Sequence, residues 1–215
     1  MTPKRAWSCS QHGVHKAFSY TRPVERLGIL GGTFDPVHVA HLAAAAAARD
    51  QLQLDRVLVV VAGDPWQKRG RVGAGAQDRF DMVVAAIEGV ERLEASRLEI
   101  DRAGPTYTVD TVETLRADTR NQLFLIVGSD VAASIDSWHR AGDLRAAVTL
   151  AIVDREDVAA TTAPPGWQCV RVHMPRLDVS STDLRRRIGA GESVDFLVPP
   201  PAARIIRTLG LYTDG

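Results

Sequence analysis

Short apolar runs recur along this chain of 215 residues and alternate with stretches that are typical of helices. The runs are rich in β-branched residues and lack polar alternation, which is typical of strands buried on both faces of a parallel sheet. The expected strands cover residues 27–30, 57–62, 97–100, 123–127, 148–153 and 169–174, and the expected helices cover residues 41–52, 77–90, 109–117 and 183–190. This order predicts a doubly wound α/β fold with a mainly parallel sheet, in which ligands bind at the carboxyl ends of the strands.

The first 25 residues differ from the rest of the chain, because they mix basic, polar and aromatic residues without a period. We therefore predict a poorly ordered N-terminal extension over residues 1–25 and a single domain over residues 26–215. The extension contains Cys9, His12 and His15, whose side chains are of types that bind metals. The sequence offers no fourth ligand at a suitable spacing, so we predict no metal site there.

The charge balance and the cysteine count exclude several classes of protein. The chain carries 26 basic and 26 acidic residues, whereas binders of nucleic acid or membrane surfaces usually show a basic excess, so we expect neither partner. The two cysteines, Cys9 and Cys169, lie far apart, which argues against a disulfide framework and favours a cytoplasmic setting. No apolar run approaches the roughly 18 residues of a membrane span. Composition leaves the oligomeric state open, a homo-oligomer included.

One corner of the chain, GGTFDPVHVAHL at residues 31–42, holds more special residues than a strand-to-helix turn needs. Gly31 and Gly32 allow a ligand to approach the backbone closely, and the helix start that follows offers N–H groups and a positive dipole end. His38 and His41 share one face of the first helical turn. Three interpretations stay open: core packing or capping, a zinc site without a third ligand, or a pair of imidazole donors for a polyphosphate.

A second segment, VSSTDLRRRI at residues 179–188, also combines a helix start with positive charge. The hydroxyl residues that open it are good N-cap residues, and the aspartate after them has capping-box spacing. Arg185 lies one turn into the expected helix, where it adds a fixed charge to a second helix N-terminus. The two arginines that follow it are expected to be surface charges.

Both segments resemble signatures of the Rossmann-like nucleotidyltransferase superfamily, G-x-F-x-P-x-H-x-G-H and I-S-S-T-x-x-R. The resemblance implies that an acceptor phosphate attacks the α-phosphorus of ATP and releases pyrophosphate, with Mg²⁺ bridging phosphate oxygens. It implies that His38 and His41 donate to the α- and β-phosphates, and that Ser181, Thr182 and Arg185 hold the β- and γ-phosphates. The ATP-binding residues that it assigns are Gly31, Gly32, Thr33, Phe34, His38, His41, Gly128, Asp130, Ser181, Thr182 and Arg185, and the catalytic residues are His38, His41, Lys68 and Arg185.

Other segments also resemble motifs of this superfamily but differ from them at some positions. Ala40 stands where relatives usually have glycine, and DPWQKRG at residues 64–70 replaces P-P-H-K but keeps the lysine as Lys68, which would add a mobile cation. Arg79 keeps an R-x-x-M spacing and is expected to be structural or to orient the substrate loop. Residues 197–212 resemble the C-terminal helix and G-L-Y ending of the family, which adds a small C-terminal helical subdomain to the Rossmann-like fold.

The acceptor side is suggested by AGPTYTVDTVETL and by IVGSD with a tryptophan eight residues later, which resemble segments of bacterial nicotinate-mononucleotide adenylyltransferases. The resemblance implies that Trp138 stacks on a pyridine ring and that Asp130 holds an adenosine ribose hydroxyl. It also implies that Thr108 and the backbone amides near Trp138 and His139 receive the nicotinate carboxylate. The substrate-binding residues that it assigns are Tyr107, Thr108, Trp138, His139 and Lys68. From the residues alone, Trp138 as a core residue and Asp130 as a helix cap stay open.

The implied activity is transfer of AMP from ATP to nicotinate mononucleotide, which gives deamido-NAD and pyrophosphate in NAD biosynthesis. Alternatives are a nicotinamide-mononucleotide or phosphopantetheine adenylyltransferase, or a nucleotide-binding regulator without turnover. Retention of His38, His41 and Arg185 argues against the regulator. The choice between acid and amide acceptor depends on donor geometry, which the sequence does not contain.

Overall fold

The structure, a computed structural model, describes residues 24–64, 73–117, 121–155 and 164–213. Its sheet has six strands in the order β3-β2-β1-β4-β5-β6, and every neighbouring pair is parallel. The strands are β1 (Arg26–Gly32), β2 (Arg56–Val61), β3 (Leu93–Ser96), β4 (Gln122–Gly128), β5 (Thr149–Arg155) and β6 (Cys169–Met174). The predicted α/β class and parallel sheet are therefore confirmed. The predictions for residues 1–23 and for Lys68 lie outside the described residues, so the domain division stays a prediction.

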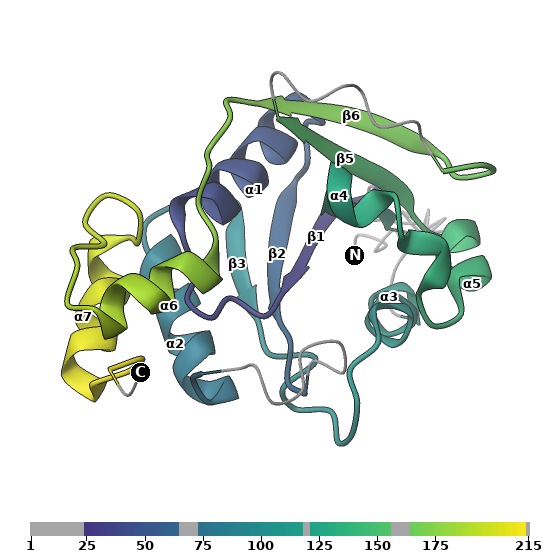
Figure 1. The fold of residues 1–215 in the computed structure, drawn as a ribbon. Coiled ribbons are helices and arrows are strands. Elements are labelled where there is room, and N and C mark those ends of the chain that lie inside the picture. The colour runs from purple at the N-terminus through teal and green to yellow at the C-terminus, as the bar shows by residue number, and fades with distance from the viewer. Residues whose placement is uncertain (1–23, 65–72, 118–120, 156–163, 214–215) are drawn as a thin grey trace, which may run out of the picture.

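Helices cover both faces of the sheet, as a doubly wound fold requires (Figure 1). On one face lie α1 (Val39–Gln51), α2 (Ala76–Ile87), α6 (Ser181–Gly189) and α7 (Pro200–Leu209), and on the other lie α3 (Thr108–Ala117), α4 (Ser129–Ala132), the 3₁₀ helix η2 (Ile135–Ser137) and α5 (Ala141–Ala147). Successive strand residues point to opposite faces, so Leu30 joins the first core cluster while Leu27 and Ile29 join the second. Burial on both faces explains the continuous apolar runs of the central strands.

The strand predicted at residues 97–100 is wrong. β3 lies four residues earlier and pairs with β2 from Val57↔Leu93 to Val60↔Ser96, while residues 98–100 form a turn. The turn is closed by the amide of Asp101, which donates to the carbonyl of Arg97 at 2.9 Å. β3 is an edge strand with only its first and last residues buried, so its sequence shows no apolar run.

Most predicted helices are present within a few residues of their expected ends. The helix expected over residues 77–90 stops at Ile87, because Gly89 adopts a positive φ of 76° that cannot continue it. The short elements α4, η2 and α5 were not predicted, since each is under two turns or only two turns long. Within the described ranges, no helix is long and apolar enough to cross a membrane.

The expected C-terminal helical part consists of α6 and α7, which lie beside α2 (Figure 1). Its apolar residues, Leu184 and Ile206 among them, belong to the same core cluster as α1 and α2. Gly210 ends α7 in the left-handed region with φ 62°. These helices are therefore packed onto the main domain beside the carboxyl end of β1.

The strand order places the topological switch point between β1 and β4. The chain runs from β1 outward to β3 and then crosses to β4 on the other side of β1. The β1–β4 ladder ends at Ile29↔Leu125, although the β1–β2 ladder continues to Gly32↔Val61. The last residues of β1 and β4 are thus unpaired with each other, and this is where open α/β sheets bind ligands.

Candidate active site

The corner after β1 is built from two glycines with different tasks. A Cβ on Gly31 would meet no atom within 4 Å, so the backbone there is open to a ligand. A Cβ on Gly32 would lie 2.8 Å from the Phe34 ring, which therefore requires glycine beneath it. Phe34 is itself buried and holds a positive φ of 51°, an uncommon conformation for a bulky residue. Its ring meets His41 edge-on, with the centroids 4.9 Å apart.

His38 and His41 stack on each other at the start of α1, with ring centroids 3.6 Å apart. The amide of His38 donates to Nδ1 of His41 at 3.2 Å, so a neutral His41 ring carries its proton on Nε2 and can donate there. His38 is 5% exposed and His41 is half-buried. Nδ1 of His41 therefore caps the start of α1, as one of the three interpretations predicted. The other ring nitrogen, Nε2, can still donate to a phosphate.

The helix start offers fewer backbone donors than the sequence predicts. The amide of Val39 donates to the carbonyl of Leu197 at 3.0 Å, and the amide of His41 donates to the carbonyl of His38 at 3.0 Å. Because the chain before α7 occupies the first amide, the half-buried imidazole of His41 is the more accessible donor of this corner. Ala40 is 8% exposed, so its methyl group packs mainly against protein.

The second signature segment lies directly against the first. Ser181 donates its hydroxyl to the carbonyl of Pro36 at 3.0 Å, and Arg185 donates to the carbonyl of Asp35 at 2.8 Å. These pairs are 145 and 150 residues apart in the chain. The start of α6, with Thr182 exposed on it, thus faces the same corner as the start of α1.

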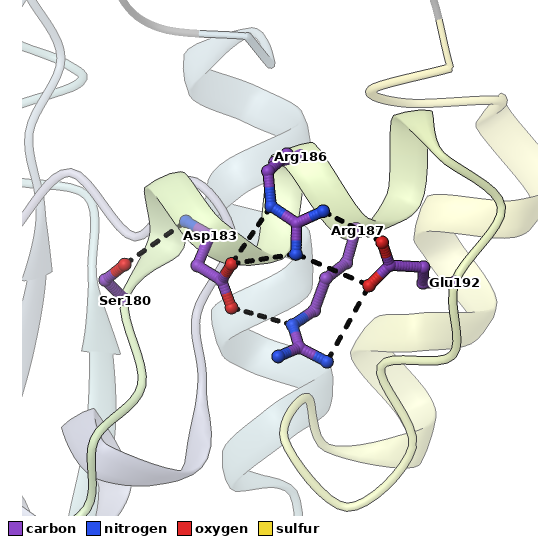
Figure 2. Close-up of polar contacts among 5 residues, drawn as sticks. All are labelled: Ser180, Asp183, Arg186, Arg187 and Glu192. Carbon is purple, nitrogen blue, oxygen red and sulfur yellow. Dashed lines mark hydrogen bonds and ion pairs between the residues drawn. The ribbon is translucent and has the colours of Figure 1, made fainter.

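The arginines after Arg185 have another role, as Figure 2 shows. Ser180 caps α6 by accepting from the amide of Asp183 at 3.2 Å, which confirms the predicted N-cap. Arg186 and Arg187 both pair with Asp183, at 3.1 and 2.7 Å, and both reach Glu192. The prediction that these two arginines are surface charges is confirmed.

Asp35 is a residue of the corner that sequence reasoning missed. Its side chain is 3% exposed and accepts hydrogen bonds from the amides of Gly73 and Ala74 at 2.7 and 3.1 Å and from the hydroxyl of Tyr212 at 2.7 Å. Arg185 lies 3.5 Å from the same carboxylate. Burial raises the pKa of Tyr212, and the hydrogen bond to Asp35 raises it further, so the phenol stays protonated and donates.

Arg79, whose role the sequence left open between two uses, is structural. It is 1% exposed and donates to three backbone carbonyls: Thr33 at 2.7 Å, Gly63 at 3.2 Å and Ala74 at 3.2 Å. Burial lowers the pKa of this guanidinium, and the charge of Asp35 opposes that effect. Arg79 therefore ties the ends of β1, β2 and the following loop into one unit.

The end of β4 carries the residues expected to contact adenosine. Gly128 is the N-cap of α4, and a Cβ there would lie 2.6 Å from Oδ1 of Asp130. The side chain of Asp130 thus folds back over Gly128 on an exposed helix start. The start of α4 has no side-chain cap hydrogen bond, so the structure does not show Asp130 as a helix cap; the residue lies just after the end of β4, next to the switch point between β1 and β4.

The residues expected to bind the acceptor gather between α3 and α5. The rings of Tyr107 and His139 lie 4.3 Å apart, and Tyr107 and Trp138 both pack against the core of that face while staying half-buried. The amide of Trp138 donates to the carbonyl of Ile135 at 3.0 Å, so it is engaged within the protein. Thr108 begins α3 and is half-buried. The structure brings these four residues together, and Trp138 is partly a core residue.

Glu99 is a second buried acid that the sequence analysis missed. It is 7% exposed and accepts a hydrogen bond from Thr111 on α3 at 2.9 Å, while Arg102 donates to the same hydroxyl at 3.3 Å. Burial raises the pKa of Glu99 above its ordinary value of 4.5, and the hydrogen bond from Thr111 opposes that effect. The group anchors the first turn of α3, where Thr108 lies.

The described residues do not form a metal cage: none of their His, Cys, Asp and Glu side chains gather in groups of three or more that could hold an ion. Asp35, the carboxylate at the corner, is already surrounded by protein donors. A divalent cation that arrives with a phosphate ligand would therefore be held by phosphate oxygens. We assign no described residue as its ligand.

In the comparison with known proteins, one family match covers the first signature segment and all but the last residue of the second. A model described as cytidylyltransferase-like matches residues 29–187. The probable nicotinate-nucleotide adenylyltransferase of Acidothermus cellulolyticus is 42% identical over 201 residues, which cover 88% of this chain and 96% of that protein. The probable enzyme of the same name from Streptomyces coelicolor is 42% identical over 186 residues, which cover 85% of this chain and 98% of that protein.

Solved structures share the fold at lower identity. The nicotinic acid mononucleotide adenylyltransferase of Plasmodium falciparum in complex with APC superposes with a TM-score of 0.72 at 19% identity, covering 89% of this chain and 98% of that chain. The same protein in complex with NaAD gives a TM-score of 0.71. At this identity the likeness concerns the arrangement of strands and helices.

Proposed function

This chain belongs to the cytidylyltransferase-like family and to its nicotinate-nucleotide adenylyltransferases, and from that premise we propose how its site works. The enzyme transfers AMP from ATP to nicotinate mononucleotide, giving nicotinate adenine dinucleotide and pyrophosphate in NAD biosynthesis. The observation that carries the mechanism is the direct contact between the two signature segments: Arg185 and Ser181 on α6 bond to the backbone of Asp35 and Pro36 beside α1.

The reaction needs positioning and charge neutralisation and no covalent enzyme intermediate. A phosphate oxygen of nicotinate mononucleotide attacks the α-phosphorus of ATP, a new P–O bond forms, and the bond to the β-phosphate breaks with release of pyrophosphate. We assign His38 and His41 to the α- and β-phosphates, where Nε2 of His41 donates to the developing charge. Ser181, Thr182 and Arg185 would hold the leaving pyrophosphate. Mg²⁺ would enter the site bound to the phosphates of ATP and would neutralise part of their negative charge.

Other site assignments rest on the family and on the position of each residue. Gly31, with open space above its backbone, would let a phosphate approach β1, and Thr33 and Phe34 shape the same corner. Gly128 and Asp130 would hold the adenosine ribose from the end of β4. Lys68 stays a proposal as a phosphate contact.

The acceptor would lie in the group formed by Tyr107, Thr108, Trp138 and His139. Trp138 presents a half-buried ring beside the switch point, which suits stacking on a flat pyridine. Thr108 at the start of α3 would receive the nicotinate carboxylate, since a helix N-terminus favours an anion. A cytoplasmic setting and the absence of a nucleic-acid or membrane partner stay predictions, and the oligomeric state stays open.

The test is a set of turnover assays with ATP and Mg²⁺ in which pyrophosphate release is followed with different acceptors. Nicotinate mononucleotide is expected to give the highest kcat/KM, above nicotinamide mononucleotide and phosphopantetheine. Equal or better turnover of either rival would reassign the acceptor. Absence of turnover with every acceptor would leave the nucleotide-binding regulator.

A further inference from the structure

The buried carboxylate of Asp35 joins parts of the chain that meet only at the phosphate corner. Oδ1 accepts from the hydroxyl of Tyr212 at 2.7 Å and from the amide of Ala74 at 3.1 Å, and Oδ2 accepts from the amide of Gly73 at 2.7 Å. All three partners are donors, so both oxygens of the carboxylate are satisfied as acceptors. We therefore assign Asp35 the role of a hydrogen-bond acceptor that holds these segments together, and not that of a catalytic acid.

Tyr212 covers this group from the C-terminal side. A Cβ on Gly73 would lie 2.8 Å from Cδ1 of the Tyr212 ring and 3.3 Å from Cδ of Arg185, so the ring and the arginine stem flank the same glycine. Closing α7 does not require the phenol, because Gly210 already ends the helix and the amide of Leu211 donates to the carbonyl of Ile206 at 3.0 Å. The hydroxyl of Tyr212 thus serves to bond Asp35 and is not needed to end the helix.

Arg185 is held by the same residue through two atoms. Its Nη1 donates to the carbonyl oxygen of Asp35 at 2.8 Å and lies 3.5 Å from the Oδ2 atom. A guanidinium is planar, so fixing one nitrogen fixes the direction of its remaining donors. The Arg185 side chain is 25% exposed, which leaves part of that fork accessible to a ligand.

We propose that Tyr212 and Asp35 are positioning residues that orient Arg185 for the triphosphate of ATP. This inference rests on the proposed function, because it takes Arg185 as a phosphate contact. The hydroxyl of Tyr212 fixes the Asp35 carboxylate, and the carboxylate and carbonyl of Asp35 fix the guanidinium. Tyr212 itself touches no substrate in this scheme.

The experiment compares Tyr212→Phe with the unaltered enzyme. The variant keeps the ring that packs on Gly73 and loses only the hydroxyl, so its thermal midpoint is expected to stay within a few degrees. Loss of a hydrogen bond to a charged group is expected to lower kcat/KM for ATP roughly tenfold. The KM for nicotinate mononucleotide is expected to stay unchanged. Thr213→Val is the matched control, because that hydroxyl bonds to the carbonyl of Gly210 at 2.8 Å and not to Asp35; its kinetics are expected to match the unaltered enzyme.

A double-mutant cycle separates positioning from a general structural role. In an Arg185→Gln background, Tyr212→Phe is expected to have no further effect on kcat/KM for ATP, since the residue it orients is gone. Multiplicative effects of the two substitutions would overturn the proposal, and so would an unchanged ATP affinity in Tyr212→Phe alone. That affinity is measured by calorimetry with a non-hydrolysable ATP analogue and needs no acceptor. Failure of the proposed function, seen as no adenylyl transfer to any pyridine mononucleotide, is therefore distinguishable from failure of this inference.

Discussion

The two halves of the site are built in opposite ways. On the phosphate side, Phe34, Asp35, His38 and Arg79 are at most 5% exposed and are fixed by backbone and side-chain contacts. On the acceptor side, Trp138 and the residues around it are half-buried or exposed and meet mainly through ring contacts. Highly charged phosphates need donors that are already in place, since reorganising polar groups during reaction is costly. A flat aromatic acceptor can instead be bound by stacking surfaces.

Arg79→Met would break the phosphate side most severely. The substitution leaves three carbonyls, two of them in buried contacts, without their shared donor, so the free energy of unfolding is expected to fall by about 3 kcal/mol or more. Urea denaturation followed by circular dichroism measures this loss. Arg97→Met is the control, because Arg97 forms an exposed ion pair with Asp101 and should cost much less. Similar losses for both variants would contradict the clamp role of Arg79.

His41→Ala tests the phosphate side without unfolding it. Removal of a donor aimed at developing charge is expected to lower kcat roughly 100-fold or more. The half-buried ring leaves the core largely intact, so the thermal midpoint should change little. His173→Ala is the control, since that residue is exposed and its bonds to Gln51 are made by its backbone, which the substitution keeps. A kcat within threefold of the unaltered enzyme would remove His41 from the mechanism.

Trp138→Ala tests the acceptor side. Loss of ring stacking is expected to raise the KM for nicotinate mononucleotide roughly five- to tenfold. The KM for ATP is expected to stay the same, because Trp138 packs against the second core cluster, whereas α6 packs into the first cluster on the other face of the sheet. Steady-state kinetics with each substrate varied in turn separate the two constants. An equal rise in both would mean that the halves of the site are not independent.

Glu99→Gln is expected to change the pH dependence of stability by a smaller amount. Burial raises the pKa of Glu99, so ionisation opposes folding, and the unaltered enzyme loses stability as the pH rises from 4.5 through the raised value. Glutamine keeps an acceptor for Thr111 but does not ionise. The thermal midpoint of the variant, relative to that of the unaltered enzyme, should therefore rise as the pH is raised from below 4.5 towards neutrality. A constant difference across that range would contradict this direction.

Ala40→Gly is expected to have the smallest effect. The methyl group is buried against protein, so restoring the family's usual glycine should change kcat/KM for ATP less than about twofold while costing roughly 0.5–1 kcal/mol of stability in the helix. Parallel assays and denaturation curves test both parts. A large gain in activity would show that the methyl crowds a phosphate.

The sequence predicted five of the six strands, edge strand β6 included, and missed edge strand β3 and the contacts that depend on distant partners. β1, β2, β4 and β5 are buried on both faces and show as apolar runs, whereas edge strand β3 does not. The two signature segments were recognised by type and spacing. The partners of Asp35 and Arg79 were not, because they are backbone groups or residues far along the chain, and no local pattern encodes them.

The spacing of the contacts at the phosphate corner has a consequence for how the chain folds. Three of its hydrogen bonds join residues that are 145, 150 and 177 positions apart. Contacts that close such long loops are made late, after local helices and neighbouring strands. A partly folded chain can therefore contain much of the sheet and still lack the corner. ATP would bind only molecules that have completed this last step, and by mass action it would draw folding to completion.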